Sequence, residues 1–162
     1  MLEQIEGNAI ELIAEIDTND APLVELNVLR SPGKDEFTRI AFYRERGYRN
    51  WERYNGWERA GLRAATDSLI TIDSSYSSTA PDVRSRAPET APVLLAPDQP
   101  LKLRVFVDKS VVEVFVNGKQ CVAMRVYPER SDSLGVSLRA QGKDATLKAL
   151  DVWQMQNIYG LD

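Results

Sequence analysis

The stretch of residues 101–128, LKLRVFVDKSVVEVFVNGKQCVAMRVYP, constrains the fold most, because it joins a long run of β-branched residues to a strong turn signal. Apolar and polar side chains alternate over residues 101–108, which is the period of a strand with one buried face. A second strand is predicted over residues 111–116. Asn117-Gly118 then favours a two-residue type I′ turn, which would return the chain as a third strand over residues 119–126.

A two-residue turn determines which side chains share a face of this hairpin. One face would hold Val112, Val114 and Val116 together with Cys121 and Ala123. We therefore predict that Cys121 is a small core residue. The other face would hold Glu113, Phe115, Val122, Met124 and Val126. Because both faces are largely apolar, the hairpin needs a cover on each side, one of them a facing sheet and the other a further part of the chain or another domain.

The rest of the chain repeats this strand pattern. Alternating segments predict strands over residues 8–17, 23–30, 37–43, 69–73, 134–139 and 146–153. Residues 74–100 hold five of the eight prolines and are predicted to be a loop between sheets, with a short strand over residues 93–95. About ten strands at this spacing indicate an all-β fold, a two-sheet antiparallel β-sandwich of the jelly-roll or concanavalin-like kind, forming one domain over residues 1–162.

Composition excludes several kinds of site. The chain has no histidine, which excludes Ser-His-Asp and Cys-His catalysis and histidine-ligated metals. A single cysteine allows no internal disulfide and no cysteine cluster for zinc, so no metal site is expected. The net charge of −4 argues against a nucleic-acid partner. No apolar run approaches the ~20 residues that span a bilayer and no signal-peptide pattern follows Met1, so we expect no membrane partner and assign no compartment.

The segment of residues 44–66 differs from the rest in being rich in aromatic residues and arginine. One interpretation is a carbohydrate-binding loop, in which flat rings contact sugar faces and guanidinium groups bind hydroxyls. The alternative is that the rings pack this segment onto the sandwich or form a subunit contact. The residues concerned are Tyr48, Trp51, Tyr54, Trp57, Arg49 and Arg53.

Three segments together resemble a known module. They are LRVFVDKSVVEVFVNGKQCVAMRVYP, the upstream ITIDSSYSS and the downstream LGVSLRAQGKDATLKALDVWQM. They are similar to the C-terminal β-sandwich of glycoside hydrolase family 32, the invertases, levanases and inulinases. The resemblance implies a parent enzyme that hydrolyses β-fructofuranosides of fructans or sucrose with two carboxylates and no metal or organic cofactor. In that family the carboxylates lie in a five-bladed β-propeller, whose W-M-N-D-P, R-D-P and E-C motifs are absent here.

The resemblance therefore implies no catalytic residue in this chain, no activity of the chain alone, and the catalytic propeller of the same enzyme as its partner. The motif residues are either contacts to that propeller or local structural groups: Asp73, Ser77, Asp108, Ser110, Glu113, Arg125 and Tyr127. In the local interpretation, Asp108 and Ser110 cap a turn and Glu113 pairs with an arginine. Asp73 is followed by Ser74, where the family usually has arginine. A further alternative is a homo-oligomer formed through an apolar outer face around Phe106, Phe115 and Met124.

Overall fold

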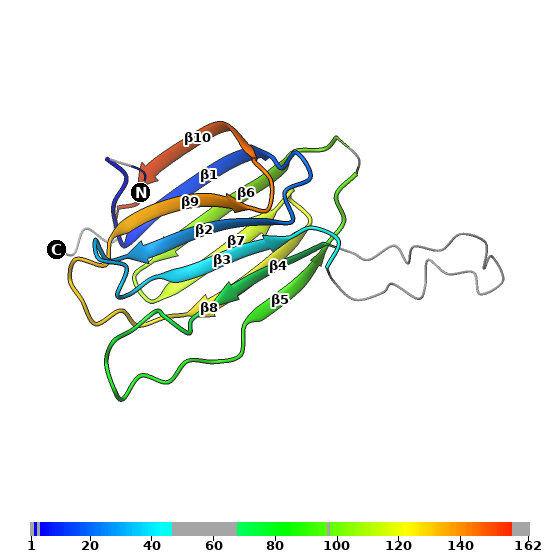
Figure 1. The fold of residues 1–162 in the computed structure, drawn as a ribbon. Helices are drawn as coiled ribbons and strands as arrows, with labels where there is room; N and C mark the ends of the chain where they lie inside the picture. Colours follow the sequence, from blue (N-terminus) through cyan, green and yellow to red (C-terminus); the bar gives the residue numbers. More distant parts are fainter. Residues whose placement is uncertain (1, 3, 47–67, 97, 157–162) are drawn as a thin grey trace.

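The computed structural model describes residues 2, 4–46, 68–96 and 98–156, which form ten β-strands and no helix (Figure 1). The strands make two facing antiparallel sheets, ordered β10-β1-β6-β7-β8 and β5-β4-β3-β2-β9. The predicted all-β sandwich is therefore confirmed. The strands are β1 (Ala9–Asp17), β2 (Leu23–Arg30), β3 (Thr38–Tyr43), β4 (Ser68–Asp73), β5 (Glu89–Val93), β6 (Leu101–Asp108), β7 (Val111–Val116), β8 (Gln120–Arg125), β9 (Gly135–Gln141) and β10 (Thr146–Gln154).

The core lies between the two sheets and is built from the alternating apolar residues of each strand. In β1 every second residue from Ile10 to Ile16 is at most 1% exposed, and β6 repeats the pattern from Leu101 to Val107. The opposite sheet contributes buried residues such as Leu26 from its interior strands. Burying one such side chain stabilises the fold by about 1.5–3 kcal/mol, so the period-two pattern orients both sheets.

The predicted hairpin forms, but its return strand is displaced by one residue. Asn117 and Gly118 have positive φ values of 50° and 66°, and the Lys119 amide donates to the Val116 carbonyl at 3.0 Å. The ladder nevertheless pairs Val116 with Gln120, because Lys119 is an extra residue in the turn. This shift exchanges the two faces of the whole return strand.

The prediction that Cys121 is a core residue is therefore wrong, because its side chain is exposed. Val122 and Met124, predicted to face outward, lie in the core at 7% and 5% exposure. Val126 is likewise buried instead of outward-facing. The short strand predicted over residues 93–95 is also misplaced, because β5 ends at Val93. As an edge strand, β5 can contain Pro92 without losing a ladder hydrogen bond that the sheet needs.

A polar network with a buried carboxylate lies on the outer side of β2 and β9 in the second sheet. Glu25 on β2 is 1% exposed, and its carboxylate accepts hydrogen bonds from Arg139 Nη2 at 2.8 Å and Asn27 Nδ2 at 2.9 Å. Burial alone would raise the pKa of Glu25, but these two partners outweigh it and lower the pKa. The interior strand β2 is buried on both faces, and its outward-facing carboxylate is paired within the sheet. The described residues include no helix of the length and hydropathy needed to cross a membrane.

Candidate functional site

Four segments that are distant in sequence converge at one end of the sandwich, on the left of Figure 1. They are residues 31–37 between β2 and β3, residues 74–86 after β4, residues 109–110 between β6 and β7, and residues 126–134 after β8. We call this surface the loop end. Backbone hydrogen bonds join its segments directly, for example from Val126 N to Ser110 O at 2.9 Å.

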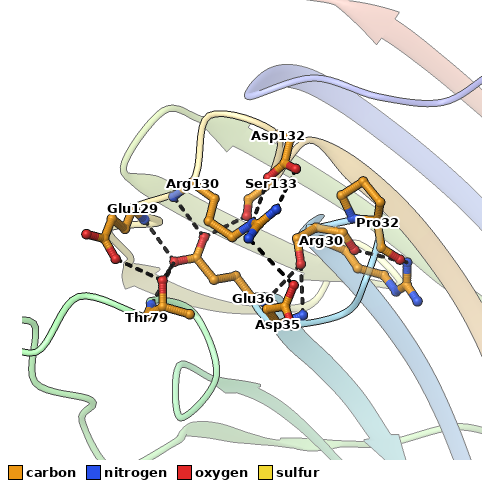
Figure 2. Close-up of polar contacts among 10 residues, drawn as sticks. Arg30, Pro32, Asp35, Glu36, Thr79, Glu129, Arg130, Asp132 and Ser133 are labelled. Atoms are coloured by element: carbon orange, nitrogen blue, oxygen red, sulfur yellow. Dashed lines mark hydrogen bonds and ion pairs between the residues drawn. The ribbon is translucent and has the colours of Figure 1, made fainter.

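Glu36 is the centre of the loop end (Figure 2). Its side chain is fully buried, and one carboxylate oxygen accepts hydrogen bonds from Thr79 N, Thr79 Oγ1 and Glu129 N at 2.7, 2.9 and 3.0 Å. The other oxygen accepts from Arg130 N at 3.1 Å and Ser133 Oγ at 2.6 Å. Burial would raise the pKa of Glu36, but these donors outweigh it and lower the pKa to about 2. Glu36 is thus an ionised group that ties three segments together.

Two of the predicted motif residues are buried structural groups. Asp73 accepts hydrogen bonds from Arg39 Nη2, from Ser75 N at 2.9 Å and from Ser75 Oγ at 2.6 Å. Burial would raise the pKa of Asp73, but these partners lower it. Ser77 Oγ lies 2.8 Å from Thr38 Oγ1, with which it shares a buried hydrogen bond. Both residues therefore shape the segment after β4.

Three further motif residues line two adjoining hollows at the loop end. Ser110 and Tyr127 line the larger hollow, of about 340 Å³, whose wall also includes residues held by Glu36. Arg125, Tyr127 and Ser77 line the smaller one, of about 240 Å³. Tyr127 is 50% exposed and belongs to both. The turn after β6, the end of β8 and the segment after β4 thus meet on one surface.

The remaining motif residues lie elsewhere. Asp108 is exposed at the end of β6, and Glu113 lies on the outer face of its sheet between Phe106 and Ala123. In the described part of the chain the side chains of Asp108, Ser110 and Glu113 make no hydrogen bond or ion pair. The turn after β6 is instead held by its backbone, through Lys109 N to Asn8 O at 2.6 Å.

The six residues proposed for carbohydrate binding, Tyr48, Arg49, Trp51, Arg53, Tyr54 and Trp57, lie outside the described residues, and their role stays a prediction. The loop end offers other aromatic groups that the sequence did not single out. Tyr76 is 53% exposed and stacks on Phe37 with 5.0 Å between ring centroids.

A separate hollow lies on the outer face of the β10-β1-β6-β7-β8 sheet. It has a volume of about 500 Å³ and is lined by Ile13, Phe106 and Phe115 with Lys102 and Arg104 at its edge. The two phenylalanine rings meet edge to face at 6.0 Å. Met124 is absent from this surface because of the register shift. Self-association through this face stays a prediction.

The buried carboxylates have the wrong electrostatics for acid catalysis of glycoside cleavage. Within the described ranges the buried acidic side chains are Glu25, Glu36 and Asp73, and the pKa of each is lowered. A glycosidase needs one carboxylic acid whose pKa is raised, so that it can donate a proton to the leaving group. All three instead serve as ionised acceptors for backbone and side-chain donors.

Comparison with known proteins agrees with the resemblance seen in the sequence. The family model described as "Glycosyl hydrolases family 32 C terminal" matches residues 1–154. A levanase of Bacillus subtilis (strain 168) is 28% identical over 155 residues, which are 95% of this chain and 20% of the levanase. An acid beta-fructofuranosidase of Vigna radiata var. radiata is 35% identical over 139 residues, 83% of this chain and 19% of that protein. The chain thus spans about a fifth of the length of these curated relatives.

Solved structures show the same fold. Exo-inulinase of Aspergillus awamori superposes with a TM-score of 0.69 at 17% identity, over 94% of this chain and 26% of that one. Fructan 1-exohydrolase IIa of Cichorium intybus gives a TM-score of 0.69 at 17% identity, over 96% of this chain and 32% of the other.

Proposed function

This chain belongs to the C-terminal domain family of the family 32 glycosyl hydrolases, and we propose that it serves as the non-catalytic sandwich module of a β-fructosidase. Its partner would be the catalytic β-propeller of the same enzyme. The substrate of the whole enzyme would be sucrose or a fructan such as levan or inulin, cleaved by two carboxylates of the propeller. Its own role would be to dock onto the propeller and stabilise it.

We assign the docking surface to the loop end. The observation that supports this most directly is the meeting of Ser77 from one family-like motif with Arg125 and Tyr127 from another around one hollow. About fifty residues of sequence separate these two motifs, yet the fold brings the motifs side by side. A half-exposed tyrosine with an apolar ring and a polar hydroxyl is a frequent anchor of protein interfaces.

The Glu36 network gives this surface a defined shape before any partner arrives. It fixes the backbone at Thr79, Glu129 and Arg130, which belong to two of the segments that border the hollows. A surface held in its bound shape loses less conformational entropy on association. This preorganisation favours a docking role over that of a mobile loop cluster.

The proposal is tested by measuring hydrolysis by the purified chain and its binding to the catalytic domain separately. The purified chain should show no turnover of sucrose, inulin or levan. It should bind the catalytic domain of the same enzyme, produced as a separate polypeptide, in an isothermal titration. Tyr127→Ala should weaken this binding by tenfold or more, about 1.4 kcal/mol or greater.

The matched control is Lys143→Ala, an exposed substitution in the turn between β9 and β10, at the other end of the sandwich. It should leave the affinity unchanged. Hydrolysis by the purified chain would overturn the non-catalytic role. Equal binding by the Tyr127 and Lys143 variants would place the docking surface elsewhere.

A further inference from the structure

The smaller hollow of the loop end, defined above, has an unusual concentration of positive charge. Its lining includes the guanidinium-bearing residues Arg84, Arg86 and Arg125 and one carboxylate, Asp82, which leaves a formal charge of +2. The whole chain, by contrast, has a net charge of −4. Positive groups gathered around one concave surface raise its local potential, which favours the entry of a negative group.

None of these three arginines has a carboxylate partner in the described part of the chain. Several other arginines are paired with carboxylates: Arg104 Nε lies 2.7 Å from Glu11, and Arg139 Nη2 lies 2.8 Å from Glu25. Even the exposed Arg130 is paired, at 2.7 Å from Asp132. The arginines of the hollow thus keep their donors available at a place where neutral donors are also present, namely the hydroxyl groups of Ser74 and Tyr127.

We infer that this hollow is a binding site for an oxyanion, meaning a carboxylate or a phosphate group. The planar guanidinium fork matches two oxygens of such a group, and charge-assisted hydrogen bonds of this kind are roughly twice as strong as neutral ones. The hollow measures about 240 Å³, below the roughly 300–1,000 Å³ of typical ligand pockets, so it suits one anionic group on a small carrier and not a sugar chain.

The walls of the hollow are ordered by contacts already described. Ser77 is fixed by Thr38, and Arg86 N donates to Ser74 Oγ at 3.3 Å, which closes the segment after β4 onto itself. Arg125 is the last residue of β8, where the ladder pairs it with Val111. The three arginines therefore project from two anchored backbone segments.

The test uses the chain itself with inorganic phosphate and citrate as probes, in isothermal titrations at constant ionic strength set with sodium chloride. Saturable binding of at least one probe is expected. Arg125→Gln and Arg84→Gln should each weaken it by tenfold or more, because a hydrogen bond to a charged group contributes about 1.5–3 kcal/mol. Lys143→Gln removes one positive charge far from the hollow and should change the affinity less than twofold.

A chain that binds neither probe, or whose arginine variants bind as well as the unaltered chain, overturns the inference. Circular dichroism and thermal unfolding of each variant confirm that the fold is kept, which is expected because both arginines are exposed.

A second arm identifies the source of the oxyanion, and it rests on the proposed docking function. If the occupant is a carboxylate of the catalytic domain, saturating phosphate should weaken docking. If the occupant is a free anion, docking should be insensitive to phosphate while direct binding persists. A chain that binds phosphate and fails to dock would refute the docking proposal and leave the oxyanion site supported.

Discussion

Replacing Glu36 by glutamine tests whether one buried carboxylate holds the loop end together. The substitution keeps the size of the side chain but turns one acceptor oxygen into an amide that can only donate. Whichever way the amide is oriented, its nitrogen would face at least one backbone N–H, that of Arg130 on one side or those of Thr79 and Glu129 on the other. At least one buried donor is then left without an acceptor.

The magnitude follows from the pKa of the group. The pKa of Glu36 is lowered from 4.5 to about 2 in the folded chain. At 1.36 kcal/mol for each unit, the ionised carboxylate contributes about 3 kcal/mol to the free energy of unfolding at neutral pH. Because the folded-state pKa is the lower one, this contribution is complete above the unfolded pKa and is lost as the pH falls from about 5 towards 2.

Urea unfolding at pH 7 and a series of measurements down to pH 3 would measure this effect. Glu36→Gln should unfold about 3 kcal/mol more easily at pH 7, equivalent to a melting temperature lower by about 6–12 °C for a chain of this size. The difference from the unaltered chain should shrink steadily below pH 5. Asp35→Asn changes an exposed neighbouring carboxylate and should cost less than about 0.5 kcal/mol. A Glu36→Gln difference that does not depend on pH would refute the argument.

Two further predictions concern the turns and the hairpin register. Cys121 should react with a thiol reagent in the folded chain, because its side chain is exposed. Partial burial and the nearby Glu113 carboxylate raise the pKa of the thiol, so the rate should still be rising above pH 9; labelling that requires unfolding would contradict the observed register. Gly142→Ala should destabilise the fold in urea titrations by more than Gly118→Ala: both have positive φ, of 83° and 66°, but a Cβ at Gly142 would lie 2.5 Å from Pro22 Cγ whereas Gly118 faces open space. The strain at Gly118 corresponds to about 1 kcal/mol, and equal losses at both sites would show that the contact with Pro22 relaxes freely.

The features of the fold that could be predicted are those determined by the sequence of a single strand. The alternation from Ile10 to Ile16 and from Leu101 to Val107 indicates which face of each strand is buried, and the structure has the same faces inside. The pairing register after a tight turn is harder to predict, because one residue more or less in the turn exchanges the two faces of the next strand. Asn117-Gly118 correctly indicated the turn, but the extra Lys119 has no signature that distinguishes it from the first residue of the next strand.

The centre of the loop end could not be predicted for a different reason. The donors to Glu36 lie 43, 93, 94 and 97 residues away along the chain. An acidic residue in a turn beside Asp35 has the local signature of a solvated surface group. Only the three-dimensional arrangement of Thr79, Arg130 and Ser133 makes it a buried acceptor.

The buried carboxylates of this module stabilise it because each of them accepts hydrogen bonds from the chain's own donors. Glu25, Glu36 and Asp73 are ionised acceptors whose partners are part of the same chain, so none of them is available to protonate a substrate. Among the described residues, by contrast, three arginines without a carboxylate partner line the smaller hollow at the loop end. An acidic protein that pairs its internal carboxylates and leaves a cluster of arginines unpaired at one preorganised surface is suited to bind a negative group there. That surface is therefore where we expect a carboxylate or a phosphate to bind, whether it is free or belongs to a docked partner.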